Sequence, residues 1–122
     1  MMTIALLTLV FLNIKHWYVD FVDQDPQEIA HKGQYGHWLG IRHSVKHGIG
    51  TAVAVALTLG PDMWLVSVML GMFESVIHYH IDWAKMNWGQ RDTRHPSFWA
   101  HLGLDQMAHH LTYVGIVAII VL

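Results

Sequence analysis

Histidine and aspartate side chains spaced four positions apart are the most chemically informative feature of this 122-residue chain. Each pair lies in an otherwise apolar segment, and residues four apart share one face of an α-helix. Each pair therefore directs two potential metal ligands toward one point. The four pairs are His16 with Asp20, His43 with His47, His78 with Asp82, and Asp105 with His109. Carboxylate and imidazole ligands suit Zn, Mn, Fe, Ni or Co, so the pairs predict one or two bound divalent metal ions.

The composition predicts a membrane protein. Apolar residues make up 53% of the chain and charged residues only 13%, which is unusual for a soluble domain. The apolar runs cover residues 1–12, 48–59, 63–73 and 111–122. Each run would rise only ~18 Å as a helix, about half of a hydrocarbon core. Each must therefore continue into the neighbouring segment, which is where the pairs lie.

A single membrane domain over residues 1–122 follows from this pattern. The expected fold is all-α, a four-helix transmembrane bundle with helices at roughly 2–24, 43–60, 62–86 and 98–122. Alternating helix directions would bring all four pairs to one end of the bundle. Stripes of small residues on the two middle helices, at Gly48, Ala52 and Ala56 and at Ser67, Gly71 and Ser75, favour their close packing.

Charge placement orients the predicted bundle. Every basic residue lies at or beyond the polar ends of the helices: Lys15, Lys32, Arg42, Lys46, Lys85, Arg91 and Arg94. The positive-inside rule then puts the histidine- and aspartate-lined half in the cytoplasm and both termini outside. The first apolar run has no basic residue before it, so we interpret it as a retained helix rather than a signal peptide. The absence of cysteine excludes thiolate ligands and disulfides.

Several other polar residues fall on the expected ligand faces. Gln24 lies one turn after Asp20, and Glu74 lies one turn before His78, so both are candidates for a catalytic or ligand-supporting role. His101 is a further candidate ligand. Lys15 and Lys85 are expected to extend toward the membrane surface, which leaves the buried aspartates to be neutralised by metal. A hydrogen-bonded network of histidine and aspartate without metal is the alternative.

The motifs HWYVDFVDQ, RHSVKH, HYHIDWAK and DQMAHH, taken in order, resemble bacterial and phage membrane proteins of domain-of-unknown-function family 3307. The resemblance runs from His16 to His109. It implies an integral membrane protein of bacterial or phage origin, without an activity, and we expect it in the bacterial inner membrane. It carries over to these positions: His16, Asp20, Gln24, His47, His78, Asp82, Asp105, Gln106 and His109.

Three functions remain open. A metal-dependent hydrolase would act on a phosphorylated or ester substrate, either a small molecule or a lipid-linked compound, at the cytoplasmic face. A metal or proton conduit, or a structural metal or b-type haem protein, would use the same side chains differently. The conduit is disfavoured by the scarcity of polar residues in the outer half. Nucleic acid is not an expected partner, because the chain has seven basic and nine acidic residues and therefore no strong positive charge. Four helices enclose a polar site poorly, so homo-oligomers are also considered.

Overall fold

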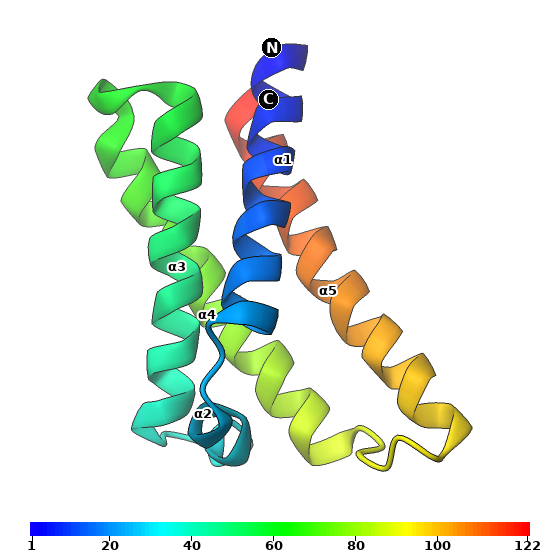
Figure 1. The fold of residues 1–122 in the computed structure, drawn as a ribbon. Helices are drawn as coiled ribbons and strands as arrows, with labels where there is room; N and C mark the ends of the chain where they lie inside the picture. Colours follow the sequence, from blue (N-terminus) through cyan, green and yellow to red (C-terminus); the bar gives the residue numbers. More distant parts are fainter.

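The computed structural model describes all 122 residues and consists of helices and connecting turns, without strands. Four long helices are present: α1 (Met2–Trp17), α3 (Trp38–Leu59), α4 (Trp64–Trp88) and α5 (Pro96–Val121). The short α2 (Pro26–His31) lies at one end of the molecule, and both termini lie at the other (Figure 1). We call the end that holds α2 the polar end. The expected all-α class is confirmed.

Three of the long helices are long and apolar enough to cross a membrane. These segments are Met2–Val22, Pro61–Trp88 and Pro96–Val121. The fourth, α3, begins at Trp38, earlier than the expected residue 43, and its first half carries Arg42, His43, Lys46 and His47. These polar residues lower its mean hydropathy. Composition thus supports three membrane-crossing helices rather than the expected four.

The distribution of buried side chains is the reverse of that in a water-soluble domain. Fifteen buried residues are polar or charged and nine are hydrophobic, whereas Leu6, Ile14 and many other large apolar side chains are exposed. Exposed apolar surface of this extent marks an interaction surface, and lipid is the partner that fits long apolar helices. The arrangement is consistent with a membrane protein.

Local signals explain where the helices begin and turn. Asp25 and Glu28 form a capping box around Pro26, which starts α2. The rings of His37 and His95 accept hydrogen bonds from Leu39 N and Ser97 N and cap α3 and α5. Gly60 adopts a φ of 90° at the turn between α3 and α4, a conformation that favours glycine.

Helices α3 and α4 pack closely through glycine. A Cβ atom added to Gly48 would lie 2.6 Å from the carbonyl oxygen of Gly71, so no larger residue fits without separating the two backbones. The small-residue stripes are therefore at this contact, as expected. Toward the termini, an apolar cluster fills the interior: Leu12, Ala54, Val55, Leu70, Tyr113, Ile116 and Val117.

Candidate metal centre

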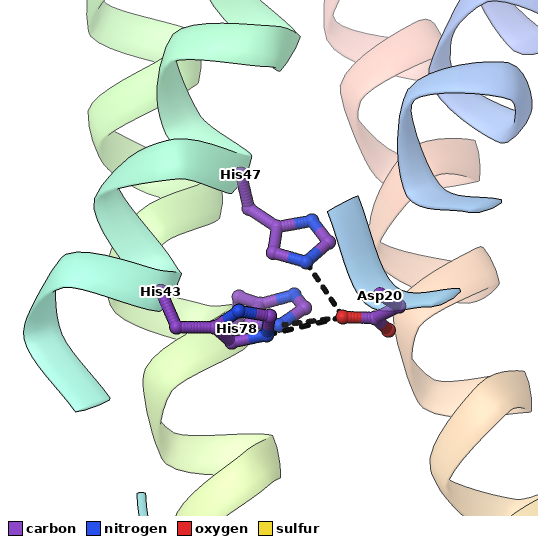
Figure 2. A group of neighbouring side chains, drawn as sticks. All are labelled: Asp20, His43, His47 and His78. Atoms are coloured by element: carbon purple, nitrogen blue, oxygen red, sulfur yellow. Dashed lines mark hydrogen bonds and ion pairs between the residues drawn. The ribbon is translucent and has the colours of Figure 1, made fainter. Parts of the chain in front are cut away.

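Asp20 lies in a short π-helix, Tyr18–Val22, that continues α1. The wider π turn was not expected from the sequence, and such turns are frequent at functional sites. The carboxylate Oδ1 of Asp20 lies 2.8 Å from His47 Nε2, 3.1 Å from His43 Nε2 and 3.9 Å from His78 Nε2. Figure 2 shows the three imidazoles, from α3 and α4, directed at this oxygen. These four side chains could hold one metal ion.

A second group adjoins the first. His78, Asp82 and His109 place one donor atom each within 4.8 Å of the others. Asp82 Oδ2 lies 3.4 Å from His78 Nε2, and Asp82 Oδ1 lies 3.4 Å from His109 Nε2. Three of these buried donors, His78 Nε2, His109 Nε2 and Asp82 Oδ2, have no hydrogen-bond partner. Buried polar atoms are rarely left unpaired, so the group is suited to a cation.

The spacing of the unpaired atoms fits metal ligation better than hydrogen bonding. Hydrogen bonds between nitrogen and oxygen span about 2.7–3.2 Å. Ligands at about 2.0–2.1 Å from a tetrahedral ion lie about 3.3–3.4 Å from one another. The 3.4 Å separations around Asp82 match the second distance, whereas the 2.8 and 3.1 Å separations around Asp20 Oδ1 lie in the hydrogen-bond range.

The remaining two predicted ligands, His16 and Asp105, lie at the edge of these groups. His16 is 3.3 Å from Asp20, but its ring nitrogens already contact the Tyr113 hydroxyl at 2.9 Å and Gln106 Oε1 at 2.8 Å. It belongs to neither group. Asp105 Oδ1 is buried, unpaired and 3.4 Å from His109 Nε2, but it is not among the donors that lie within 4.8 Å of one another in the second group.

Glu74 lies behind the histidines rather than among the ligand atoms. Its carboxylate is 3.3 Å from His78 Nδ1 and 4.0 Å from His47 Nδ1, while the Nε2 atoms of both rings point at the ligand groups. Carboxylates in this position fix the orientation and tautomer of metal-binding histidines. His78 Nδ1 has no hydrogen-bond partner, so the placement of Glu74 favours a supporting carboxylate that acts through its charge over a general base.

Glu28 of α2 takes the corresponding position behind His43. Its fully buried carboxylate lies 3.5 Å from His43 Nδ1, 2.8 Å from Arg42 Nε and 3.0 Å from Lys46 Nζ. Burial raises the pKa of Glu28, but hydrogen bonds from Lys46 and Arg42 outweigh that effect and hold the pKa below its ordinary value. The short helix α2 is thereby tied to the ligand-bearing start of α3.

The lysines contradict one sequence-based expectation. Lys15 does not extend toward the surface: it is buried, and its Nζ lies 3.3 Å from Glu74 Oε1 and donates to the Tyr113 hydroxyl at 3.1 Å. Lys85 donates to Asp105 at 3.0 Å, and the buried Lys32 lies 3.3 Å from Asp82. Each pairs with a carboxylate because no other group in the apolar interior can neutralise it. The expectation that the basic side chains leave the aspartates uncovered was wrong for Asp82 and Asp105, whereas Asp20 has only histidine partners.

Gln24 and Gln106 lie where the centre opens to the surface. Gln24 donates to the carbonyl oxygen of Asp20 and accepts from Lys32, at 2.9 and 3.1 Å. Gln106 bridges His16 and Asp105. Both line a pocket of about 440 Å³ at the polar end, with Asp20 in its wall. The centre is therefore not sealed.

The other histidines lie outside the centre. His101 Nδ1 accepts from Gln90 N at 2.7 Å, and His80 contacts the Tyr35 hydroxyl at 3.0 Å. The residues that sequence reasoning missed are Lys15, Lys32, Glu28 and Tyr113. Tyr113 follows His109 by four positions, and Glu28 precedes Lys32 by four, so helical spacing could have indicated both.

The centre thus combines buried carboxylates, imidazoles with unpaired nitrogens and a route to the surface. This is an arrangement that can hold a metal ion and expose it to a second molecule. No family model, curated protein or solved structure matches the chain.

Proposed function

We propose that the protein is an integral membrane metalloprotein that hydrolyses a phosphorylated or ester substrate at its polar end. The observation that carries the metal is the set of buried donor atoms without hydrogen-bond partners, His78 Nε2, His109 Nε2 and Asp82 Oδ2. An unpaired buried polar atom costs roughly 1–3 kcal/mol, and a metal ion would recover that cost at the two histidine nitrogens, whereas Asp82 Oδ2 already faces Lys32 Nζ at 3.3 Å.

The two donor groups share His78, so a second ion needs another third ligand, and we assign that role to Asp105. The first ion is assigned to the four side chains around Asp20 Oδ1, namely Asp20, His43, His47 and His78. The second is assigned to His109, whose Nε2 lies 3.4 Å from both Asp82 Oδ1 and Asp105 Oδ1. Three protein ligands leave one position free at a tetrahedral ion, as in catalytic zinc sites.

Access from outside supports hydrolysis over a purely structural metal. The pocket of about 440 Å³ joins Asp20 to the polar end and is lined by Lys32, Lys85 and Arg91. A divalent ion would supply a water of lowered pKa and polarise a phosphoryl or acyl oxygen. The chain's own contribution is to support the histidine ligands through Glu74 and Glu28 and to supply cations near an anionic substrate.

The two other functions fit the structure less well. A conduit needs polar positions along its whole length, but the interior beyond Tyr113 is the apolar cluster around Leu12 and Ile116. A haem needs two histidines on opposite faces of a wide macrocycle. Here the rings stack on one another, with centroids 3.6 Å apart for His47 and His78 and 4.2 Å for His78 and His109.

The placement in the membrane is part of the same proposal. All four long helices cross a bacterial inner membrane, with the exposed Ile49, Val53 and Leu57 of α3 facing lipid, and the polar end faces the cytoplasm. The basic residues at that end support this orientation. The buried state of His43 and His47 supports a crossing α3, because its polar side chains face the interior.

Elemental analysis of purified protein tests the metal. The wild type should carry two divalent ions per chain, His109→Ala about one, and His78→Ala one or none. His80→Ala, on the same helix as His78 but outside the centre, should match the wild type. Equal metal content in all four proteins would end the metal assignment in favour of a hydrogen-bonded network.

Hydrolysis is tested separately with metal-loaded protein. Generic phosphomonoester, phosphodiester and carboxylester substrates would be compared, with His78→Ala as the inactive control and His80→Ala as the active one. A metal content of two ions without turnover of any of these substrates would leave a structural metal role.

A further inference from the structure

A second cavity lies beside the pocket at the polar end and shares Lys85 with it. This cavity, of about 330 Å³, runs between α4 and α5, and we call it the chain groove. Its apolar wall consists of Ile81, Ala84, Trp88, Leu104 and Ala108. Asp105 of the metal centre lies in the same groove.

The chain groove opens between two helices that are apolar enough to cross a membrane. Both α4 and α5 belong to candidate spans, and Trp88 and Leu104 are exposed, at 73% and 59%. Because the helices that border it are the ones expected to face lipid, a molecule in this groove would come from the bilayer. An apolar wall there would not stabilise the binding of a polar, soluble metabolite.

The pocket of about 440 Å³, which we call the headgroup pocket, has the opposite character at its mouth. Lys32, Lys85 and Arg91 line it together with the amides of Gln24, Gln90 and Gln106. Lys32 and Lys85 are paired with carboxylates, but the Arg91 guanidinium is exposed and forms no ion pair. An unpaired guanidinium suits an oxygen-rich anion, and arginine binds phosphate through two parallel hydrogen bonds.

We infer that the headgroup pocket and the chain groove together bind one phosphorylated amphiphile, with its phosphate at Arg91 and Lys85 and its hydrocarbon chain along α4 and α5. The inference rests on the proposed function, since it names the substrate class of the same site. Lys85 borders both cavities, so a single molecule can pass from one to the other. Asp20 and Asp105 would then lie beside the phosphate, where the metal centre is assigned.

A binding measurement that needs no turnover tests this inference. The protein in phosphate-free maltoside micelles would be titrated with a dibrominated dodecylphosphonate, which is not hydrolysed and quenches nearby tryptophan. We expect saturable quenching that is reduced in Trp88→Phe, because Trp88 lines the chain groove, with Trp83, whose ring centroid lies 5.1 Å from that of Trp88, contributing the remainder. The half-saturating concentration should rise about tenfold in Arg91→Gln, as expected for loss of one charge-assisted contact.

The matched control is Arg94→Gln. Arg94 lies three residues from Arg91, but it pairs with Asp92 and lies outside the headgroup pocket. It should leave the titration within about twofold of the wild type. Equal shifts for the two variants, or quenching that Trp88→Phe leaves intact, would overturn the inference.

Competitors separate the chemical parts of the ligand. Unbrominated dodecylphosphonate should displace the probe, whereas dodecanol and dodecanoate should be much weaker. Displacement by inorganic phosphate as effectively as by the alkylphosphonate would assign the site to free phosphate and overturn the amphiphile. Metal-stripped and metal-loaded protein would both be titrated. If the probe still binds to a protein that is shown to lack metal and activity, the proposed hydrolase function is wrong but the amphiphile-binding site stands.

Discussion

Lys15 and Glu74 form a buried ion pair, with 3.3 Å between Nζ and Oε1, directly behind the histidines of the metal centre. The exposed fractions of their side chains are only 7% and 1%. The pair joins α1 to α4, and Glu74 in turn contacts His78 Nδ1 at 3.3 Å. Any change to Lys15 therefore acts on the stability of the bundle and on the charge behind a candidate ligand.

Replacing Lys15 alone should destabilise the protein strongly. Lys15→Met leaves the Glu74 carboxylate buried without a cation, which costs about 3–5 kcal/mol. The double variant Lys15→Met/Glu74→Gln should recover most of this loss, because the uncompensated charge is gone. The free energy of unfolding in detergent micelles, followed by circular dichroism, would measure both. A single variant as stable as the double would show that the pair is not the source of the stability.

Neutralising Glu74 alone should weaken metal binding. Glu74→Gln retains the shape of the side chain but removes the charge behind His78 and His47. Loss of such a supporting carboxylate typically lowers metal affinity about 10–100-fold. Competition with a chelator of known affinity would measure it, with Asp23→Asn, a surface carboxylate, as the control. An unchanged affinity in Glu74→Gln would remove Glu74 from the centre.

The contact between α3 and α4 should not tolerate a methyl group at Gly71. A Cβ atom there would meet the Gly48 carbonyl oxygen and lie 3.1 Å from Ala52 Cβ, so the helices must separate. Gly71→Ala should cost about 1–3 kcal/mol of unfolding free energy, as overpacking does. Gly103→Ala places its methyl group in open space and should be neutral or slightly stabilising. Equal effects at the two positions would argue against the close contact.

The α2 segment should loosen at acidic pH through Glu28. Its folded pKa lies below the ordinary value of 4.5, so its stabilising effect is complete above pH 4.5 and is lost as the pH falls through the folded pKa. The groups that face it are Arg42, Lys46 and His43. The difference in unfolding free energy between wild type and Glu28→Gln should therefore shrink below about pH 4.5. A difference that grows on acidification would contradict this sign.

Topology can be tested by labelling single cysteines, since the chain has none of its own. Asp62→Cys lies in the turn before α4, and Thr93→Cys lies between α4 and α5 at the polar end. An impermeant maleimide applied to intact cells should label the first and not the second. Labelling of Thr93→Cys alone would reverse the proposed orientation.

The helical class and the ligand pairs could be predicted from sequence because both depend on local periodicity. A spacing of four places His78 and Asp82 on one helix face wherever that helix lies, and long apolar runs indicate membrane-length helices. The alternating up and down directions of the long helices could also be predicted, because their polar ends alternate along the chain. The three candidate spans and the grouping of histidine with aspartate are consistent with that prediction.

Only the tertiary structure decided how these side chains meet. The sequence does not show that Lys15 turns inward to Glu74 or that Lys32 reaches Asp82, because these partners come from different helices. It also does not show that Tyr113 and Gln106 occupy both nitrogens of His16 and keep it out of the ligand groups. Helical spacing determines which residues share a face, whereas the rotation and approach of neighbouring helices determine which faces touch.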